Sequence, residues 1–140
     1  MWEFKTGNTL GALAFSSYGG FWMSFAALEI NAFGFLNAYT NPTDLNNDLG
    51  IYLLSWAIFS LLMTIASHRT TFLLFFLFFF VFMTFLMLSI GKFTGGNLNC
   101  QEAGGAFGII AAALAWYVYM LLYSICYIIC THLFYCMYAI

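Results

Sequence analysis

Four long apolar segments, separated by shorter polar ones, set the pattern of the chain. A helix rises about 1.5 Å per residue, so about 20 apolar residues cross the hydrocarbon core of a bilayer. Each segment comes close to that length, although the second is slightly short. The pattern predicts four membrane-spanning helices, over residues 10–35, 51–67, 72–91 and 103–117 or beyond.

The polar separators predict the connections between these helices. Residues 37–50 contain several Asn, two Asp and the only Pro of the chain, and we expect them to form the single long loop. Residues 68–71 are expected to form a tight turn, and residues 91–102 a glycine-rich connector.

Composition agrees with a membrane protein. Hydrophobic residues make up 64% of the 140 residues and charged residues 6%. Soluble domains carry about 25% charged residues, so this chain has too few charges to cover a water-facing surface. We therefore expect an all-α, polytopic membrane helix bundle. The few basic residues form no patch, which argues against nucleic acid as a partner.

The basic residues also predict an orientation. With four spans, Lys5 and Arg69 lie on one side of the membrane and Lys92 on the other. Loops rich in Lys and Arg stay on the cytoplasmic side. We expect an integral protein of the plasma membrane with both termini in the cytoplasm.

Small and polar residues gather in "GNTLGALAFSSYGGFW", residues 7–22. Helices in lipid associate through close packing and interhelical hydrogen bonds, which favours Gly, Ala, Ser and Thr. On a helical wheel these residues form two opposed stripes, so this helix is expected to lie between two neighbours, or between a neighbour and a pore. The fourth segment has one such stripe. The expected packing residues are Gly7, Gly11, Gly20, Gly104 and Gly108.

The same stretch suits a small carboxylate. An unpaired anion is costly to bury in hydrocarbon, and hydroxyl and amide groups bind it without a fixed cation that would trap it. Asn8, Thr9, Ser16, Ser17 and Tyr18 supply such groups. Hydrogen bonding between helices is the alternative interpretation of Thr9, Ser16 and Ser17.

Two carboxyl groups are candidate proton carriers. A small carboxylic acid has a pKa near that of Glu, about 4.3, so it is mostly an anion at neutral pH. Transport together with a proton removes that charge, and Glu3 or Glu29 is placed to carry the proton. A solvated charge at a helix end is the alternative for Glu29.

Other chemistry finds little support. Cys126, Cys130, His132 and Cys136 lie in apolar surroundings, and structural zinc sites usually show a different, CxxC-type spacing. The chain shows no convincing pair of nucleophile and base and no phosphate-binding loop. We expect no metal, no cofactor and no enzyme activity. The tryptophans are expected to pack or to lie at the membrane interface rather than to contact a substrate: Trp22, Trp56 and Trp116.

These segments resemble the acetate uptake transporter family of YaaH-type proteins, which includes bacterial succinate–acetate permeases and fungal acetate or ammonia export proteins. The resemblance covers residues 1–117 and is closer to the fungal members. It is carried by "GNTLGALAFSSYGGFW", "GIYLLSWAIFSLLMTIAS", "FLMLSIG" and "AGGAFGIIAAALAWY".

The resemblance implies a six-helix bundle that assembles as a homo-hexamer, with a substrate path in each protomer. It implies transport of acetate or other small monocarboxylates, proton-linked or channel-like. The family narrows its path with a Phe of its first helix, a Tyr and a Leu. Tyr18 matches the Tyr, Val81 falls at the position of the Leu, and the Phe has no counterpart.

The resemblance also implies that the chain is truncated at both ends. The four predicted spans correspond to family helices three to six, and the signature Asn-Pro-Ala-Pro-Leu-Gly-Leu of the first helix has no match. Residues 1–117 would be a partial transporter domain, and residues 118–140 an apolar tail. The match stops before Val118, and every Val codon begins with GT, as an intron donor does. We therefore hypothesise that the tail is a translated intron or frameshift.

Two other functions stay open. One is export of ammonia or ammonium by a member of the same family. The other, of a different class, is a non-transporting four-span structural membrane protein or an inactive fragment.

Overall fold

The computed structural model describes the backbone of residues 2–138 and the side chains of Glu3 to Leu121 and of Ser124. All regular elements of this part of the chain are helical, which confirms the all-α prediction. The helices are α1 (Trp2–Lys5), α2 (Thr9–Glu29), α3 (Pro42–Ser67), α4 (Phe72–Phe93) and α5 (Leu98–Tyr138), with the short 3₁₀ helices η1 (Asn31–Phe33) and η2 (Leu36–Ala38) between α2 and α3.

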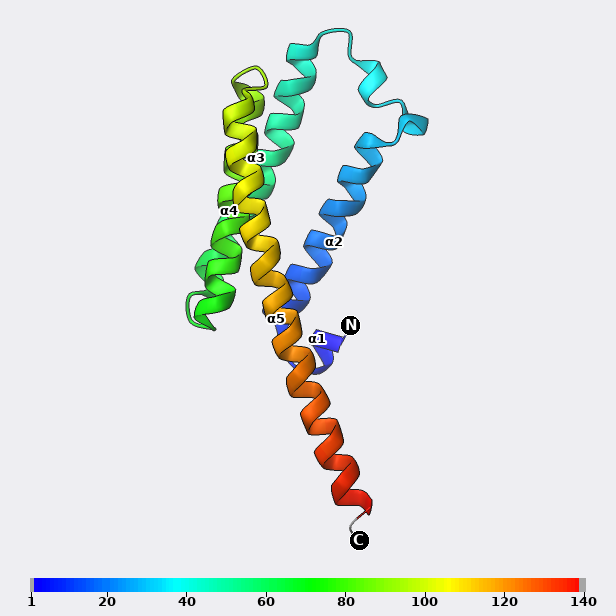
Figure 1. The fold of residues 1–140 in the computed structure, drawn as a ribbon. Helices are drawn as coiled ribbons and strands as arrows, with labels where there is room; N and C mark the ends of the chain where they lie inside the picture. The colour runs from blue at the N-terminus through cyan, green and yellow to red at the C-terminus, as the bar shows by residue number, and fades with distance from the viewer. Residues whose placement is uncertain (1, 139–140) are drawn as a thin grey trace.

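The helices α3, α4 and α5 run side by side, whereas α2 leans away from them towards its C-terminal end (Figure 1). The second half of α5 extends beyond the other helices (Figure 1). The molecule therefore has a tightly packed part, α3–α5, and a more loosely attached helix, α2.

Three helical stretches of the described chain are long and apolar enough to cross a membrane: Pro42–Ser67, Phe72–Phe93 and Leu98–Leu121. The polytopic membrane bundle is thus confirmed. The helix α2 has 21 residues but is less apolar, because it contains Ser16, Ser17 and a pair of glycines. The count of four membrane spans stays a prediction.

The ends of several elements differ from the prediction. The predicted connector over residues 91–102 was wrong from Leu98 onwards, where α5 already begins. The predicted loop over residues 37–50 was wrong from Pro42 onwards, where α3 begins. Proline is well suited to the first turn of a helix, since that position needs no N–H donor, and Asp44 adds a favourable negative charge to the same turn. At the other end of the connection, α2 stops at Glu29, several residues before the predicted end.

The connection between α2 and α3 is fastened to α3 by a side chain. The Tyr39 hydroxyl donates a hydrogen bond to the Asp48 carboxylate. This bond favours the protonated phenol and raises the pKa of Tyr39 above its ordinary value.

The interface between α3 and α4 depends on small residues. The Phe93 ring lies over Gly50, where a Cβ would come within 2.9 Å of a ring carbon. The Ser89 hydroxyl donates to the Gly50 carbonyl oxygen at 2.9 Å. Such close approach holds helices together in lipid. The buried residues of α3 fall on one side of the helix, mostly three or four positions apart: Gly50, Leu53, Ala57, Ser60, Met63, Thr64 and Ser67.

The interface between α4 and α5 uses glycines of α5. A Cβ on Gly104 would come within 2.9 Å of the Leu88 side chain and 3.3 Å of the Leu88 backbone nitrogen. At Gly108 the nearest atom is the methyl carbon of Thr84, at 3.5 Å. Gly104 therefore sets how closely the two helices approach.

We predict that Gly104→Ala gives a less stable bundle than Gly105→Ala. Both changes bring the same gain in helix propensity, but an added Cβ meets nothing within 4 Å at Gly105. Overpacking at Gly104 should lower the free energy of unfolding by about 1–3 kcal/mol relative to the control. Reversible unfolding in mixed micelles measures the difference, and equal stability of the two variants would contradict close packing at Gly104.

Candidate functional site

Tyr18 joins α2 to both α3 and α4. Its hydroxyl donates a hydrogen bond to Ser60 Oγ at 3.0 Å, and Ser60 is completely buried on α3. Its ring stacks on Phe78 of α4, with ring centroids 6.2 Å apart, and meets Phe59 of α3 edge-on at 5.8 Å. Tyr18 is therefore a polar group held within a frame of aromatic rings.

An apolar cluster continues from Tyr18 along the same face of α2. Phe21, which is 4% exposed, contacts the rings of Trp56 at 5.1 Å and Phe85 at 4.8 Å between centroids. Tyr18 and Val81 both pack against the cluster that Phe21 and Phe85 form with residues of α3. The structure thus brings together the two residues that the family resemblance placed at a narrow point of the path.

A groove of 520 Å³ lies between α2 and α3. The groove is open along its length rather than enclosed. Two of its lining rings, Trp56 and Phe59, also contact the Tyr18 ring. The groove therefore borders the aromatic frame of Tyr18. Its lining residues are Ser16, Ser17, Gly20, Ser55, Trp56 and Phe59.

Two of the three serines of the groove hydrogen-bond within their own helix. Ser16 Oγ donates to the Ala12 carbonyl oxygen of its own helix at 2.7 Å. Ser55 Oγ likewise donates to the Ile51 carbonyl oxygen at 2.9 Å. Such bonds are common for Ser inside helices and do not link α2 to a neighbour. Ser17, the third serine, also lines the groove.

Asn8 and Thr9 lie at the start of α2. Asn8 caps the helix: its side-chain oxygen accepts from the Gly11 N–H at 3.1 Å, and its amide nitrogen donates to Glu3 Oε2 at 2.6 Å. Thr9 is the first residue of the helix and is exposed. Both residues are separated from Tyr18 by about 14 Å of helix rise, so the structure does not bring them to the aromatic frame.

The glycines expected to pack have different surroundings. Gly7 lies in the turn before α2 with a φ of +79°, and Gly11 lies against the Asn8 side chain. A Cβ on Gly20 would meet nothing within 4 Å, and Gly20 lines the groove. Gly104 and Gly108 face α4, as described above.

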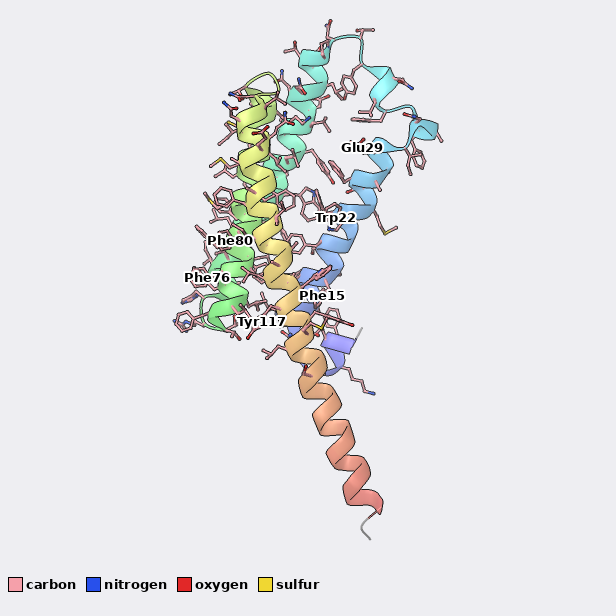
Figure 2. The ribbon with its side chains drawn as sticks, in the orientation of Figure 1. Phe15, Trp22, Glu29, Phe76, Phe80 and Tyr117 are labelled. Carbon is pink, nitrogen blue, oxygen red and sulfur yellow. The ribbon has the colours of Figure 1, made fainter. Side chains whose placement is uncertain are left out.

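The two candidate proton carriers are both far from Tyr18 along the chain. Glu29 is the last residue of α2, is exposed and lies at the end of the helix that leans away (Figure 2). About 16 Å of helix rise separates it from Tyr18. Glu3 is hydrogen-bonded to the cap residue Asn8.

Metal ligands are not clustered in the part of the chain whose side chains are described. The candidate ligands near the C-terminus, which were Cys126, Cys130, His132 and Cys136, lie outside the described side chains.

Several residues of the site were not predicted from the sequence. Phe21 had a usable signal, because it follows Tyr18 by three positions and so shares its helix face. Ser60 gave no such signal, since its pairing with Tyr18 spans 42 positions. Trp56 was expected only to pack or to lie at the interface, and it both packs in the cluster and lines the groove.

Comparisons with known proteins identify related sequences. A sequence model of the GPR1/FUN34/yaaH family matches residues 1–135. The match runs past Tyr117, and the division of the chain at that residue stays a prediction.

Curated relatives from fungi align with 84% of the chain. "Accumulation of dyads protein 2" and "Ammonia transport outward protein 2" of Saccharomyces cerevisiae are 50% and 46% identical, with 41% and 42% of their own lengths covered. "Acetate permease A" of Emericella nidulans is 40% identical, with 43% covered. The chain thus spans about two fifths of the length of these relatives.

A solved structure, that of the bacterial acetate channel SatP, has the same arrangement of helices. It superposes with a TM-score of 0.73 at 34% sequence identity. The alignment covers 84% of this chain and 62% of the SatP chain.

We predict that Tyr18 and Ser60 stabilise the bundle jointly. Tyr18→Phe removes the interhelical hydrogen bond and leaves the buried Ser60 hydroxyl without it, so the free energy of unfolding should fall by about 1 kcal/mol. A double-mutant cycle with Ser60→Ala should give a coupling of about 0.5–1.5 kcal/mol. The matched control pairs Tyr18→Phe with Ser55→Ala, whose hydroxyl bonds within its own helix, and should be additive. If the effects of Tyr18→Phe and Ser60→Ala on the free energy of unfolding are also additive, the hydrogen bond between Tyr18 and Ser60 is refuted.

Proposed function

Because this chain belongs to the GPR1/FUN34/yaaH family, we propose that it carries acetate or another small monocarboxylate across a membrane. The observation that carries the proposal is the Tyr18 hydroxyl, which reaches Ser60 across the α2–α3 interface inside a frame of aromatic rings. The similarity to the bacterial acetate channel SatP and to the fungal acetate permease A supports the same substrate.

The groove supplies a first contact for the substrate. Its polar groups are serine hydroxyls, and its lining includes no Lys or Arg. Ser17 donates to the carboxylate, and Ser16 and Ser55 do so only after releasing the carbonyl oxygens of their own helices. The methyl group packs against Trp56 and Phe59. A hydroxyl donor lacks the fixed positive charge of Lys or Arg, so it holds a carboxylate less strongly than an ion pair does, and the substrate can leave again.

Tyr18 and Val81 then form the narrow point. The surrounding cluster is apolar, so a bare anion is disfavoured there. The Tyr18 hydroxyl compensates by donating to the carboxylate in place of Ser60. Passage is either channel-like or linked to a proton, and in the second case Glu3 or Glu29 carries the proton. Asn8 and Thr9 belong to the end of the path at the start of α2.

The oligomeric state, the cellular membrane and the orientation of the protein are also part of the proposal. The working form is a homo-hexamer in the plasma membrane, with both termini in the cytoplasm, as Lys5 and Arg69 predict. Large apolar side chains are exposed on α2, among them Phe15 (70%) and Trp22 (65%) (Figure 2). In the hexamer they contact lipid or a neighbouring copy. The transport names of the relatives support transport rather than catalysis.

A second candidate function is export of ammonia or ammonium. It is favoured by the 46% identity to the yeast protein named for outward ammonia transport. The hydroxyl groups that donate their protons to a carboxylate also accept hydrogen bonds from N–H groups on their oxygens. The chemistry of the groove therefore suits both substrates, and flux measurements separate them.

We predict uptake of labelled acetate by cells that lack their own acetate carrier and express this chain. Uptake should fall about tenfold in Tyr18→Phe, because one hydrogen bond to an anion is lost. Proton-linked passage should also be faster at acid than at neutral pH.

The matched control is Tyr117→Phe, which removes the same hydroxyl from an exposed position on α5 (Figure 2). It should leave uptake unchanged. If the chain reaches the membrane and uptake equals that of empty cells, acetate transport is refuted. Ammonia release measured on the same cells then tests the second candidate function.

A further inference from the structure

A second pair of hydroxyls links α2 and α3. Ser24 Oγ of α2 lies 2.6 Å from the Tyr52 hydroxyl oxygen of α3. Ser24 Oγ also donates to the Phe21 carbonyl oxygen at 2.9 Å, and the Tyr52 hydroxyl lies 3.4 Å from that carbonyl. Two hydroxyls and one backbone carbonyl thus form one hydrogen-bonded group.

This pair lies where the groove ends. Ser24 follows Gly20 by one helical turn on α2, and Tyr52 precedes Ser55 and Trp56 by one turn on α3. Gly20, Ser55 and Trp56 line the groove. The faces that form the groove therefore continue to Ser24 and Tyr52, in the direction of Glu29.

The pair is separated from Tyr18 by aromatic rings. The Tyr52 ring stacks on Phe21 with centroids 5.9 Å apart, Phe21 contacts Trp56 at 5.1 Å, and Trp56 contacts Tyr18 at 6.3 Å. About 9 Å of helix rise lies between Tyr18 and Ser24. Two hydroxyl pairs, Tyr18–Ser60 and Ser24–Tyr52, thus stand on either side of a buried apolar ring.

The hydrogen bonds of the pair can be exchanged without leaving a polar group unpaired. Ser24 supplies the Phe21 carbonyl, so Tyr52 can turn its proton from Ser24 Oγ to a ligand. A carboxylate oxygen accepts that proton. The hydrogen bond then has a charged acceptor, which makes it stronger than the bond between neutral hydroxyls that it replaces. Ser24 is exposed and Tyr52 half-buried, so a ligand in the groove can reach them.

From this geometry we propose that Ser24 and Tyr52 form a second binding station for a small carboxylate, one step along the path from Tyr18. Tyr52 donates to the carboxylate, and Ser24 holds the Tyr52 hydroxyl in position while the station is empty. The inference rests on the proposed acetate transport. It adds that the substrate crosses the Phe21 ring between two hydroxyl pairs.

The test is the concentration dependence of labelled acetate uptake by cells that express the chain, at neutral and acid pH. Tyr52→Phe keeps the ring and removes only the donor. It should raise the half-saturating acetate concentration about tenfold, with a larger effect at neutral pH, where the substrate is an anion. Ser24→Ala should also raise it, and Ser24→Thr, which restores a hydroxyl, should raise it less. Tyr117→Phe is the matched control.

Each outcome decides the proposal. If the unmodified chain takes up acetate and the half-saturating acetate concentration is unchanged in both Tyr52→Phe and Ser24→Ala, the second station is overturned. Acetate transport then remains intact. A loss of maximal rate that merely follows the amount of protein in the membrane, equal at both pH values, shows a structural role and also overturns it. No acetate uptake by the unmodified chain overturns both this proposal and the proposed function.

Discussion

Close contact between backbones is the constraint on which the bundle depends. Lipid tails are as apolar as leucine side chains, so helices in a membrane gain little by burying apolar surface against one another. The chain instead places Gly50 beneath the Phe93 ring and Gly104 against Leu88. The bond from Ser89 to the Gly50 carbonyl adds a polar contact at the same interface. These contacts make α3, α4 and α5 one packed unit.

The attachment of α2 follows a different principle. Its backbone stays further from α3, and the space is filled by rings around Phe21 and bridged by the hydroxyls of Tyr18 and Ser24. Long side chains that meet at their tips leave room beside them, and the groove occupies that room. The separation that makes α2 less tightly packed thus also opens the space in which the proposed function places the carboxylate.

Local patterns explain which features could be predicted from the sequence. The helical segments follow from long apolar runs, and Tyr18 follows from a specific motif. The start of α3 at Pro42 was missed because polar residues suggested a loop, although proline at a first helical position was a usable signal. The partnership of Tyr18 with Ser60 depends on how α2 and α3 are juxtaposed, which no local pattern specifies. Asn8 was selected for its amide, and only the structure shows that this amide caps α2.

The two hydroxyl pairs each join a tyrosine to a serine across the α2–α3 interface, but in reverse order. At the middle of α2 the tyrosine belongs to α2 and the serine to α3, and nearer its C-terminal end the serine belongs to α2 and the tyrosine to α3. Because α2 and α3 run in opposite directions, a half-turn rotation approximately exchanges one pair for the other. Under the proposed function, a carboxylate that enters from either end of α2 therefore meets the same succession of hydroxyls, aromatic ring and hydroxyls.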